Sequence, residues 1–147
     1  MKFKFSALAV SMIMLTSVGC NQGAHSTRGF RLPEGDAANG QVLFVQYGCN
    51  GCHSIKGVEA NAEKEIATLV VLGGPVTLDK TYADLVTSVI NPSHRISRLL
   101  DQSTVQVEGK SVMRNYNDIL TVTDLIDLVA FLQPQYELVD VPRTYPL

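Results

Sequence analysis

The chain has 147 residues, a length that suits one domain, and its composition is that of an ordinary globular protein. It carries 14 acidic against 12 basic residues and a formal net charge of −2. Because proteins that bind nucleic acids present a basic face to the phosphates, this composition argues against a nucleic-acid partner.

The first residues have the layout of an export signal. Lys2 and Lys4 precede an almost uncharged, mostly apolar run over residues 5–18. This run is about 14 residues long, whereas a membrane-spanning helix needs roughly 20, so a permanent transmembrane anchor is the weaker interpretation. We therefore predict a signal peptide over residues 1–19, whose removal takes away two basic residues and no acidic one.

The apolar run ends in Ser17-Val18-Gly19-Cys20, which resembles the cleavage box of bacterial lipoproteins. Ser17 departs from the pattern, because lipoproteins usually have leucine there. The resemblance implies a lipidated Cys20 on the periplasmic side of a bacterial membrane. The alternative is a cysteine that happens to lie near an ordinary cleavage site. Residues 20–34 are polar and irregular, and we expect them to form a flexible tether between the lipid and the domain.

A first helix is predicted from about Ala37 to Gln46, with Asp36 as its N-cap. Val42, Leu43 and Phe44 give it an apolar surface. Gly40 lies inside this helix, where glycine costs about 1 kcal/mol relative to alanine. A glycine at such a position often indicates the close approach of another helix.

The helix leads directly to Cys49-Asn50-Gly51-Cys52-His53, a CxxC pair followed at once by histidine. This pattern is typical of c-type haem attachment. Two thiols three positions apart on a tight turn can each form a thioether with one of the two haem vinyl groups. The next residue, His53, then lies beneath the iron and can be its proximal ligand.

Three other interpretations of the cysteine pair are a thioredoxin-like pair, a zinc site and a structural disulfide. A thioredoxin-like CxxC is expected beside a βαβ pattern, and strands and helices do not alternate here. A zinc site needs two further ligands, and the remaining histidines, His25 and His94, do not form a pair. A structural disulfide between Cys49 and Cys52 is the plainest alternative. One covalently bound haem is the favoured interpretation.

Two more helices are predicted further along the chain. One runs over about residues 79–90, capped by Asp79 or Thr81 and stopped by Pro92. The other starts at Thr121 or Thr123 and has apolar residues at helical spacing up to Leu132. The apolar run 69–72 is a short strand or buried coil, and residues 134–147 form an extended tail. No segment demands a sheet, so the predicted fold class is all-α.

A haem that transfers electrons usually has a second axial ligand, methionine or histidine. Of the four methionines, Met1, Met12 and Met14 leave with the signal, and only Met113 remains. It lies in a polar loop just before the last helix, which makes it the favoured distal ligand. His94 is the rival, and an iron site left open for gases or peroxide is the third possibility.

Residues 35–133 resemble the class I cytochromes c. The likeness is carried by a glycine-containing first helix, the haem box, a following proline, and a methionine loop before a terminal helix. These features correspond to Gly40 with Phe44, to residues 48–53, to Gly74-Pro75, and to Met113 with residues 120–132.

The resemblance implies a small cytochrome c fold with three or more helices around one haem c. In the family, the carbonyl oxygen of the proline corresponding to Pro75 orients the ligand histidine. This sequence departs from the pattern at Arg114, where many members have proline, and in the length of the tail over residues 134–147.

The leading hypothesis for function is one-electron transfer between redox protein partners, without catalysis of its own. The alternative is a haem subunit of an exported dehydrogenase or oxidase complex. A third hypothesis, catalysis or gas sensing, needs a vacant iron site, and Met113 argues against it. One CxxCH excludes a two-haem peroxidase.

Overall fold

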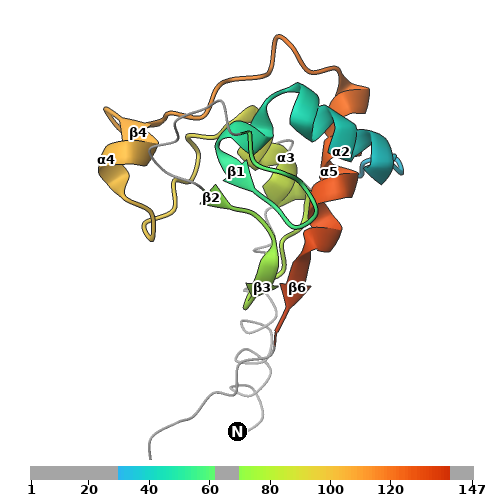
Figure 1. Ribbon diagram of the computed structural model, residues 1–147, viewed down its shortest axis with the longest axis horizontal. Helices are drawn as coiled ribbons and strands as arrows, with labels where there is room; N and C mark the ends of the chain where they lie inside the picture. Colours follow the sequence, from blue (N-terminus) through green and yellow to red (C-terminus); the bar gives the residue numbers. More distant parts are fainter. Residues whose placement is uncertain (1–29, 62–69, 140–147) are drawn as a thin grey trace, which may run out of the picture. The chain divides into compact units, whose positions relative to one another are not determined.

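The computed structural model describes residues 30–61 and 70–139 (Figure 1). The chain divides into two compact units, residues 1–31 and 32–147, and the second carries the elements below. The predicted signal peptide, Cys20, most of the tether and residues 140–147 lie outside the described residues. Within the described residues, no helix has both the length and the apolar character to cross a membrane.

Four α-helices provide most of the regular structure: α2 (Ala37–Gln46), α3 (Tyr82–Ile90), α4 (Gln102–Val105) and α5 (Val122–Leu132). Two short 3₁₀ turns, η1 (Cys49–Gly51) and η2 (Gln133–Gln135), follow α2 and α5. The predicted bounds of the first helix are confirmed, and Thr81 and Thr121 are the N-caps of the next two. The short helix α4 was not predicted.

Six short strands pair in twos, which the sequence did not predict. Strands β1 (His53–Ser54) and β2 (Val70–Val71) are parallel, as are β3 (Gly74–Val76) and β6 (Tyr136–Leu138). Strands β4 (Gln106–Val107) and β5 (Lys110–Ser111) form an antiparallel hairpin. These pairs are short, and the fold remains mostly helical.

Helix α2 packs against α5, and Gly40 is the reason that they approach so closely. A Cβ atom at Gly40 would overlap the carbonyl oxygen of Asp127 on α5. One turn further along, Phe44 and Phe131 meet edge to face with 5.8 Å between their ring centroids. The close approach inferred from the glycine is confirmed.

The core lies between α2, α3 and α5. Its buried members are mostly leucine, valine and phenylalanine from these three helices, with Ile55 after β1. Capping boxes fix where two of the helices begin, because Thr81 and Asp84 bond each other's backbone, as do Thr121 and Asp124. The apolar faces of the helices then close one side of the site described next.

The first part of the predicted tail packs on the domain. Residues 133–135 continue α5 as a 3₁₀ turn, and residues 136–138 pair with Gly74–Val76. Gly73 permits this approach: it has a φ of +87°, and a Cβ there would lie 2.8 Å from the Gln135 carbonyl oxygen. The domain therefore extends beyond the predicted boundary at residue 133.

Candidate functional site

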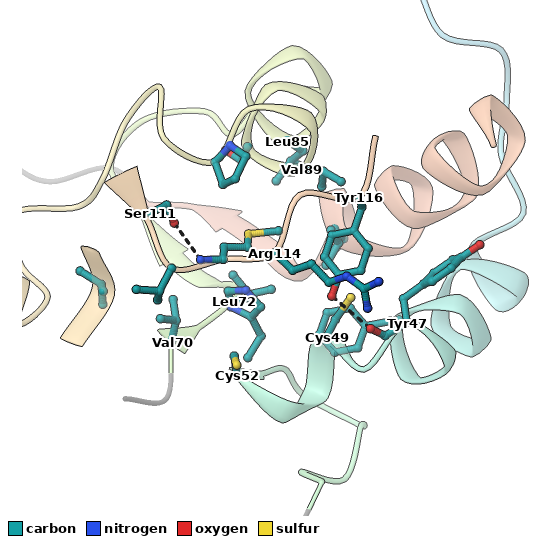
Figure 2. A pocket seen from close by; sticks show the side chains of 18 of the residues that line it. Tyr47, Cys49, Cys52, Val70, Leu72, Leu85, Val89, Ser111, Arg114 and Tyr116 are labelled. Atoms are coloured by element: carbon teal, nitrogen blue, oxygen red, sulfur yellow. Dashed lines mark hydrogen bonds between the residues drawn. The ribbon is translucent and has the colours of Figure 1, made fainter. Parts of the chain in front are cut away.

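A cavity of about 650 Å³ opens among α2, α3, α5, the Cys49–His53 segment and the loop around Met113. Apolar side chains line most of it, including Leu85 and Val89 of α3 and Leu72 after β2, and Figure 2 shows these three around the space. Its volume is in the range of pockets that bury cofactors, about 300–1,000 Å³.

Cys49 and Cys52 lie together on one wall of the cavity (Figure 2). The chain reaches this wall through Gly48, which has a positive φ of +72° and is the N-cap of η1. Cys49 is half-buried and Cys52 is exposed, and both are thiols rather than halves of a disulfide. The tight turn predicted for the CxxC pair is thus present, with both sulfur atoms at the cavity.

His53 is half-buried in β1 and lines the same cavity. Its Nδ1 atom is buried and has no hydrogen-bond partner among the described residues. Burial lowers the pKa of His53, and the backbone of Val70 opposes that shift. The side chain is therefore biased toward neutral imidazole, which is the form that binds a metal ion.

Pro75 does not stand beside His53. It is exposed in β3, where it pairs with Glu137, and it is not among the residues that line the cavity. The hydrogen bond expected between its carbonyl oxygen and the His53 ring is absent from the described residues. The reason is that β3 pairs with β6, whereas the strand that pairs with His53 in β1 is β2.

Met113 lines the cavity and is half-buried. Its backbone N–H donates to Ser111 Oγ at 3.2 Å, a bond drawn in Figure 2. On its other side Tyr116 is buried and donates from its hydroxyl to the Tyr47 carbonyl oxygen at 3.1 Å. The methionine loop is thus tied both to the β5 strand and to the end of α2.

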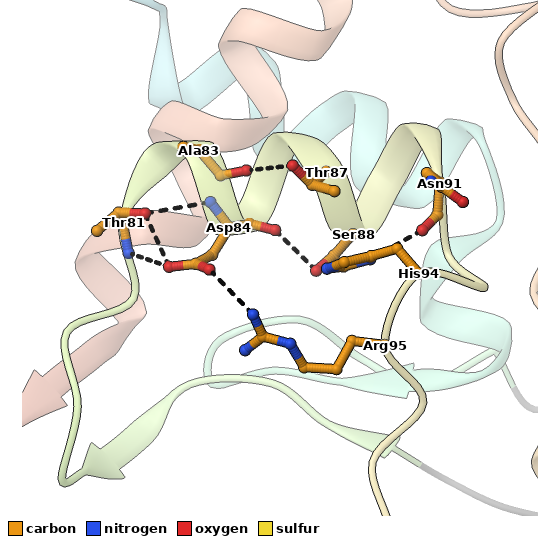
Figure 3. Close-up of polar contacts among 8 residues, drawn as sticks. All are labelled: Thr81, Ala83, Asp84, Thr87, Ser88, Asn91, His94 and Arg95. Atoms are coloured by element: carbon orange, nitrogen blue, oxygen red, sulfur yellow. Dashed lines mark hydrogen bonds and ion pairs between the residues drawn. The ribbon is translucent and has the colours of Figure 1, made fainter. Parts of the chain in front are cut away.

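His94 is exposed, which does not suit an axial ligand of a haem inside the cavity. Its Nδ1 lies 2.9 Å from the Asn91 carbonyl oxygen, and the two residues are next to each other in Figure 3. It does not line the cavity. Within the described residues there is no cluster of three or more histidines, cysteines or acids that could hold a metal ion.

Sequence reasoning missed three groups that line the cavity: the aromatic pair Tyr47 and Tyr116, the inner face of α3, and three basic residues. The tyrosine rings meet edge to face at 6.1 Å between centroids. The basic residues are Lys80, Arg95 and Arg114. The apolar period of α3 was visible in the sequence, but the tyrosines and the basic residues come from separate segments that share no local pattern.

The residues that line the cavity fit a haem better than a thioredoxin-like pair, a zinc site or a structural disulfide. Two thiols on a tight turn, an imidazole with an orphaned buried nitrogen, and a thioether all face one largely apolar space. Thiols can hold a haem covalently, and imidazole and thioether are the usual axial ligands of its iron in electron carriers. The site therefore defines a protein that carries haem through covalent bonds.

The comparison with known families agrees. Residues 37–135 match the cytochrome c family, and the chain belongs to it. No curated protein and no solved structure matches the chain significantly. Membership confirms the predicted fold class, the covalent haem c with its iron, and haem-based electron transfer with redox partners.

Proposed function

We propose that the protein is a monohaem class I electron carrier with His53 and Met113 as the axial ligands of its iron. The supporting observation is that both residues and both thiols line one cavity, although Met113 comes from a segment beyond α3 and α4. His94, the rival ligand, is exposed and bonded to its own loop.

Bound haem supplies an iron that accepts and releases one electron. The chain's own residues hold it and set its surroundings. Cys49 and Cys52 are the thiols for covalent attachment, and the neutral imidazole of His53 is ready to ligate. A thioether from Met113 favours ferrous iron and so raises the reduction potential relative to a second imidazole. The apolar wall from α3 and α5 keeps water away.

The ligand assignment is tested by absorption spectra of the oxidised and reduced protein, made in a host that matures c-type haem. Wild type should show a far-red band from the bond between methionine sulfur and ferric iron. Met113→Ala should lose that band and keep its covalent haem. The matched control is His94→Ala, which should leave the spectrum unchanged. A Met113→Ala spectrum identical to that of wild type would refute the His/Met pair.

We also propose that lipid at Cys20 tethers the mature domain to the periplasmic side of a bacterial membrane. The support is the signal layout and the cysteine at its end. Cys20→Ser should abolish lipid attachment, measured as incorporation of labelled palmitate, without loss of haem. Palmitate incorporation equal to that of wild type would show that Cys20 is not the lipidated residue.

The alternative, an obligate subunit of an exported oxidoreductase complex, receives less support. The start of the tail, which could have served as a docking arm, pairs with β3 of its own domain at residues 136–138. The mass of the haem-loaded protein in solution, measured after removal of its lipid, separates the two. A monomer is expected, and a stable complex with other chains in the native membrane extract would favour the alternative.

A further inference from the structure

The methionine loop, residues 112–121, carries the proposed second iron ligand and runs as irregular chain from the end of β5 to the N-cap of α5. The thioether of Met113 is a neutral ligand that favours ferrous iron, so a nitrogen ligand from solution can compete with it for ferric iron. How well Met113 competes depends on the effective concentration of its sulfur at the iron. Contacts that stiffen this loop therefore strengthen the ligand.

The side of the loop before Met113 is held by backbone donors. The N–H of Ser111 donates to Ser93 Oγ at 3.1 Å, and the N–H of Val112 donates to the Val105 carbonyl oxygen at 3.0 Å. Ser93 follows α3 in the chain, and Val105 is the last residue of α4. The chain is thus fixed up to the residue directly before the methionine.

The side of the loop after Met113 is held by Tyr116, which is only 9% exposed. Its hydroxyl donates to the carbonyl oxygen of Tyr47, the C-cap of α2, at 3.1 Å. Carbonyl groups at the C-terminus of a helix have no partner within the helix, so this acceptor is available. The Tyr116 ring also meets the Tyr47 ring edge to face, and the Arg114 guanidinium carbon lies 5.6 Å from its centroid. Figure 2 shows the three side chains side by side.

A second side chain holds the loop at α3. Asn117 Nδ2 donates to the carbonyl oxygen of Ile90, the last residue of that helix, at 3.0 Å. Asn117 is exposed, so water can take the place of its amide, and we expect this bond to contribute less than that of Tyr116. The two bonds fasten the loop to the C-terminal ends of two helices that flank the cavity.

We propose that Tyr116, with Asn117 as a weaker second, is a positioning residue that keeps the Met113 thioether at the iron by fastening the methionine loop to the end of α2. The proposal rests on the ligand assignment above and adds what holds the second ligand in place. Three positions of extended chain, about 10 Å, separate Tyr116 from Met113. With Val112 fixed on the other side, Met113 has little freedom to leave the cavity that it lines.

The test uses imidazole, a small nitrogen ligand, with the haem-loaded ferric protein. Imidazole takes the place of the methionine sulfur at the iron, and loss of the far-red band reports the exchange. Titration gives an apparent Kd, and a lower Kd means a weaker hold on Met113. Stopped-flow rates at high imidazole approach the rate at which the methionine leaves the iron.

Tyr116→Phe removes the donor and keeps the ring. The apparent Kd of imidazole should fall about fivefold, the order expected for one net hydrogen bond, and the limiting rate should rise. Asn117→Ala should lower the Kd about twofold, because its bond is exposed. The matched control is Tyr82→Phe, which removes a hydroxyl from a half-buried tyrosine outside the cavity lining and should leave both values unchanged.

Denaturant unfolding of the same variants separates positioning from a general effect on stability. A Tyr116→Phe protein with a lower unfolding midpoint but the wild-type Kd for imidazole would overturn the proposal, as would an equal fall in Kd in Tyr82→Phe. If Tyr116→Phe does not retain its haem, Asn117→Ala tests the same loop, and an unchanged Kd there would count against the proposal.

Failure of the ligand assignment itself is distinguishable. Wild-type ferric protein would then lack the far-red band, and Met113→Ala would bind imidazole with the wild-type affinity. A far-red band in wild type that Tyr116→Phe leaves equally resistant to imidazole would refute the positioning role alone.

Discussion

Asp127 is a charged side chain in an apolar core, and its two oxygens explain why it is tolerated there. It is 6% exposed on α5. Oδ1 accepts from the Asp36 backbone N–H at 2.8 Å, and Oδ2 accepts from Asn39 Nδ2 at 2.8 Å. The carboxylate thereby lies at the N-terminus of α2, where the helix dipole favours a negative charge. One residue of the last helix thus fixes the start of the first.

This arrangement gives a prediction for a single substitution. Asp127→Ala should lower the free energy of unfolding by about 2–3 kcal/mol, because it leaves the two donors without their acceptors. The measurement is denaturant unfolding of the haem-loaded protein. Asp118→Ala, which removes an exposed carboxylate, is the control and should have little effect. Equal losses from both variants would mean that the two part-buried hydrogen bonds of Asp127 contribute nothing specific.

Single residues also show what the sequence could predict about the site. Cys49, Cys52 and His53 form a local motif whose chemistry fixes its spacing, so their convergence was predictable. Met113 was found by elimination and does line the cavity. Pro75 was assigned to the site by resemblance to the family. The structure instead pairs it with Glu137 of β6, away from the strand that lies beside His53. That arrangement depends on a pairing between residues some 60 positions apart, for which no local signal exists.

At the scale of elements, helix ends were predictable because capping residues act within a few positions. Thr81 with Asp84 and Thr121 with Asp124 both form the boxes that their spacing suggests. The strand pairs were not predictable, because each strand has only two or three residues and therefore no measurable period. Their partners come from distant loops, and tertiary packing decides whether they form.

The two capping boxes contribute to the dependence of folding stability on pH. A hydrogen bond from Thr81 lowers the pKa of Asp84, and bonds from the Thr121 backbone and the Tyr47 hydroxyl lower the pKa of Asp124. A carboxyl whose pKa is lower in the folded state stabilises it above the unfolded pKa, about 3.9, and that stability is lost as pH falls through the folded pKa. The two residues thus favour folding at neutral pH.

We therefore expect Asp84→Asn and Asp124→Asn to reduce stability at pH 7 and to flatten its fall below about pH 4. Thermal unfolding followed by circular dichroism from pH 7 to pH 2 measures both effects. Asp79→Asn, an exposed neighbour outside the boxes, is the reference. Parallel pH curves for all three variants and wild type would show that the boxes are not the source of the acid response.

At the scale of the whole molecule, the C-terminal segment completes the domain. Strand β6 pairs with β3, and Tyr136 packs against the buried cluster. Truncation after Gln135 should therefore lower stability by about 2 kcal/mol, the order expected for one large apolar side chain returned to water. Truncation after Val139, which keeps β6, should not. Denaturant midpoints of the two truncated proteins measure the difference, and equal midpoints would show that β6 does not contribute.

The contact between α2 and α5 also bears on the order of haem attachment and domain closure. The bond from Asp36 to Asp127 joins residues 91 positions apart, with the haem-attachment thiols between them and close to the earlier one. If the chain is exported with its N-terminus first, as proposed above, Cys49 and Cys52 emerge from the membrane pore well before α5. During that interval no second helix holds α2, and the thiols would be accessible to whatever attaches the haem. Arrival of the last helix would close the domain around a cofactor already in place.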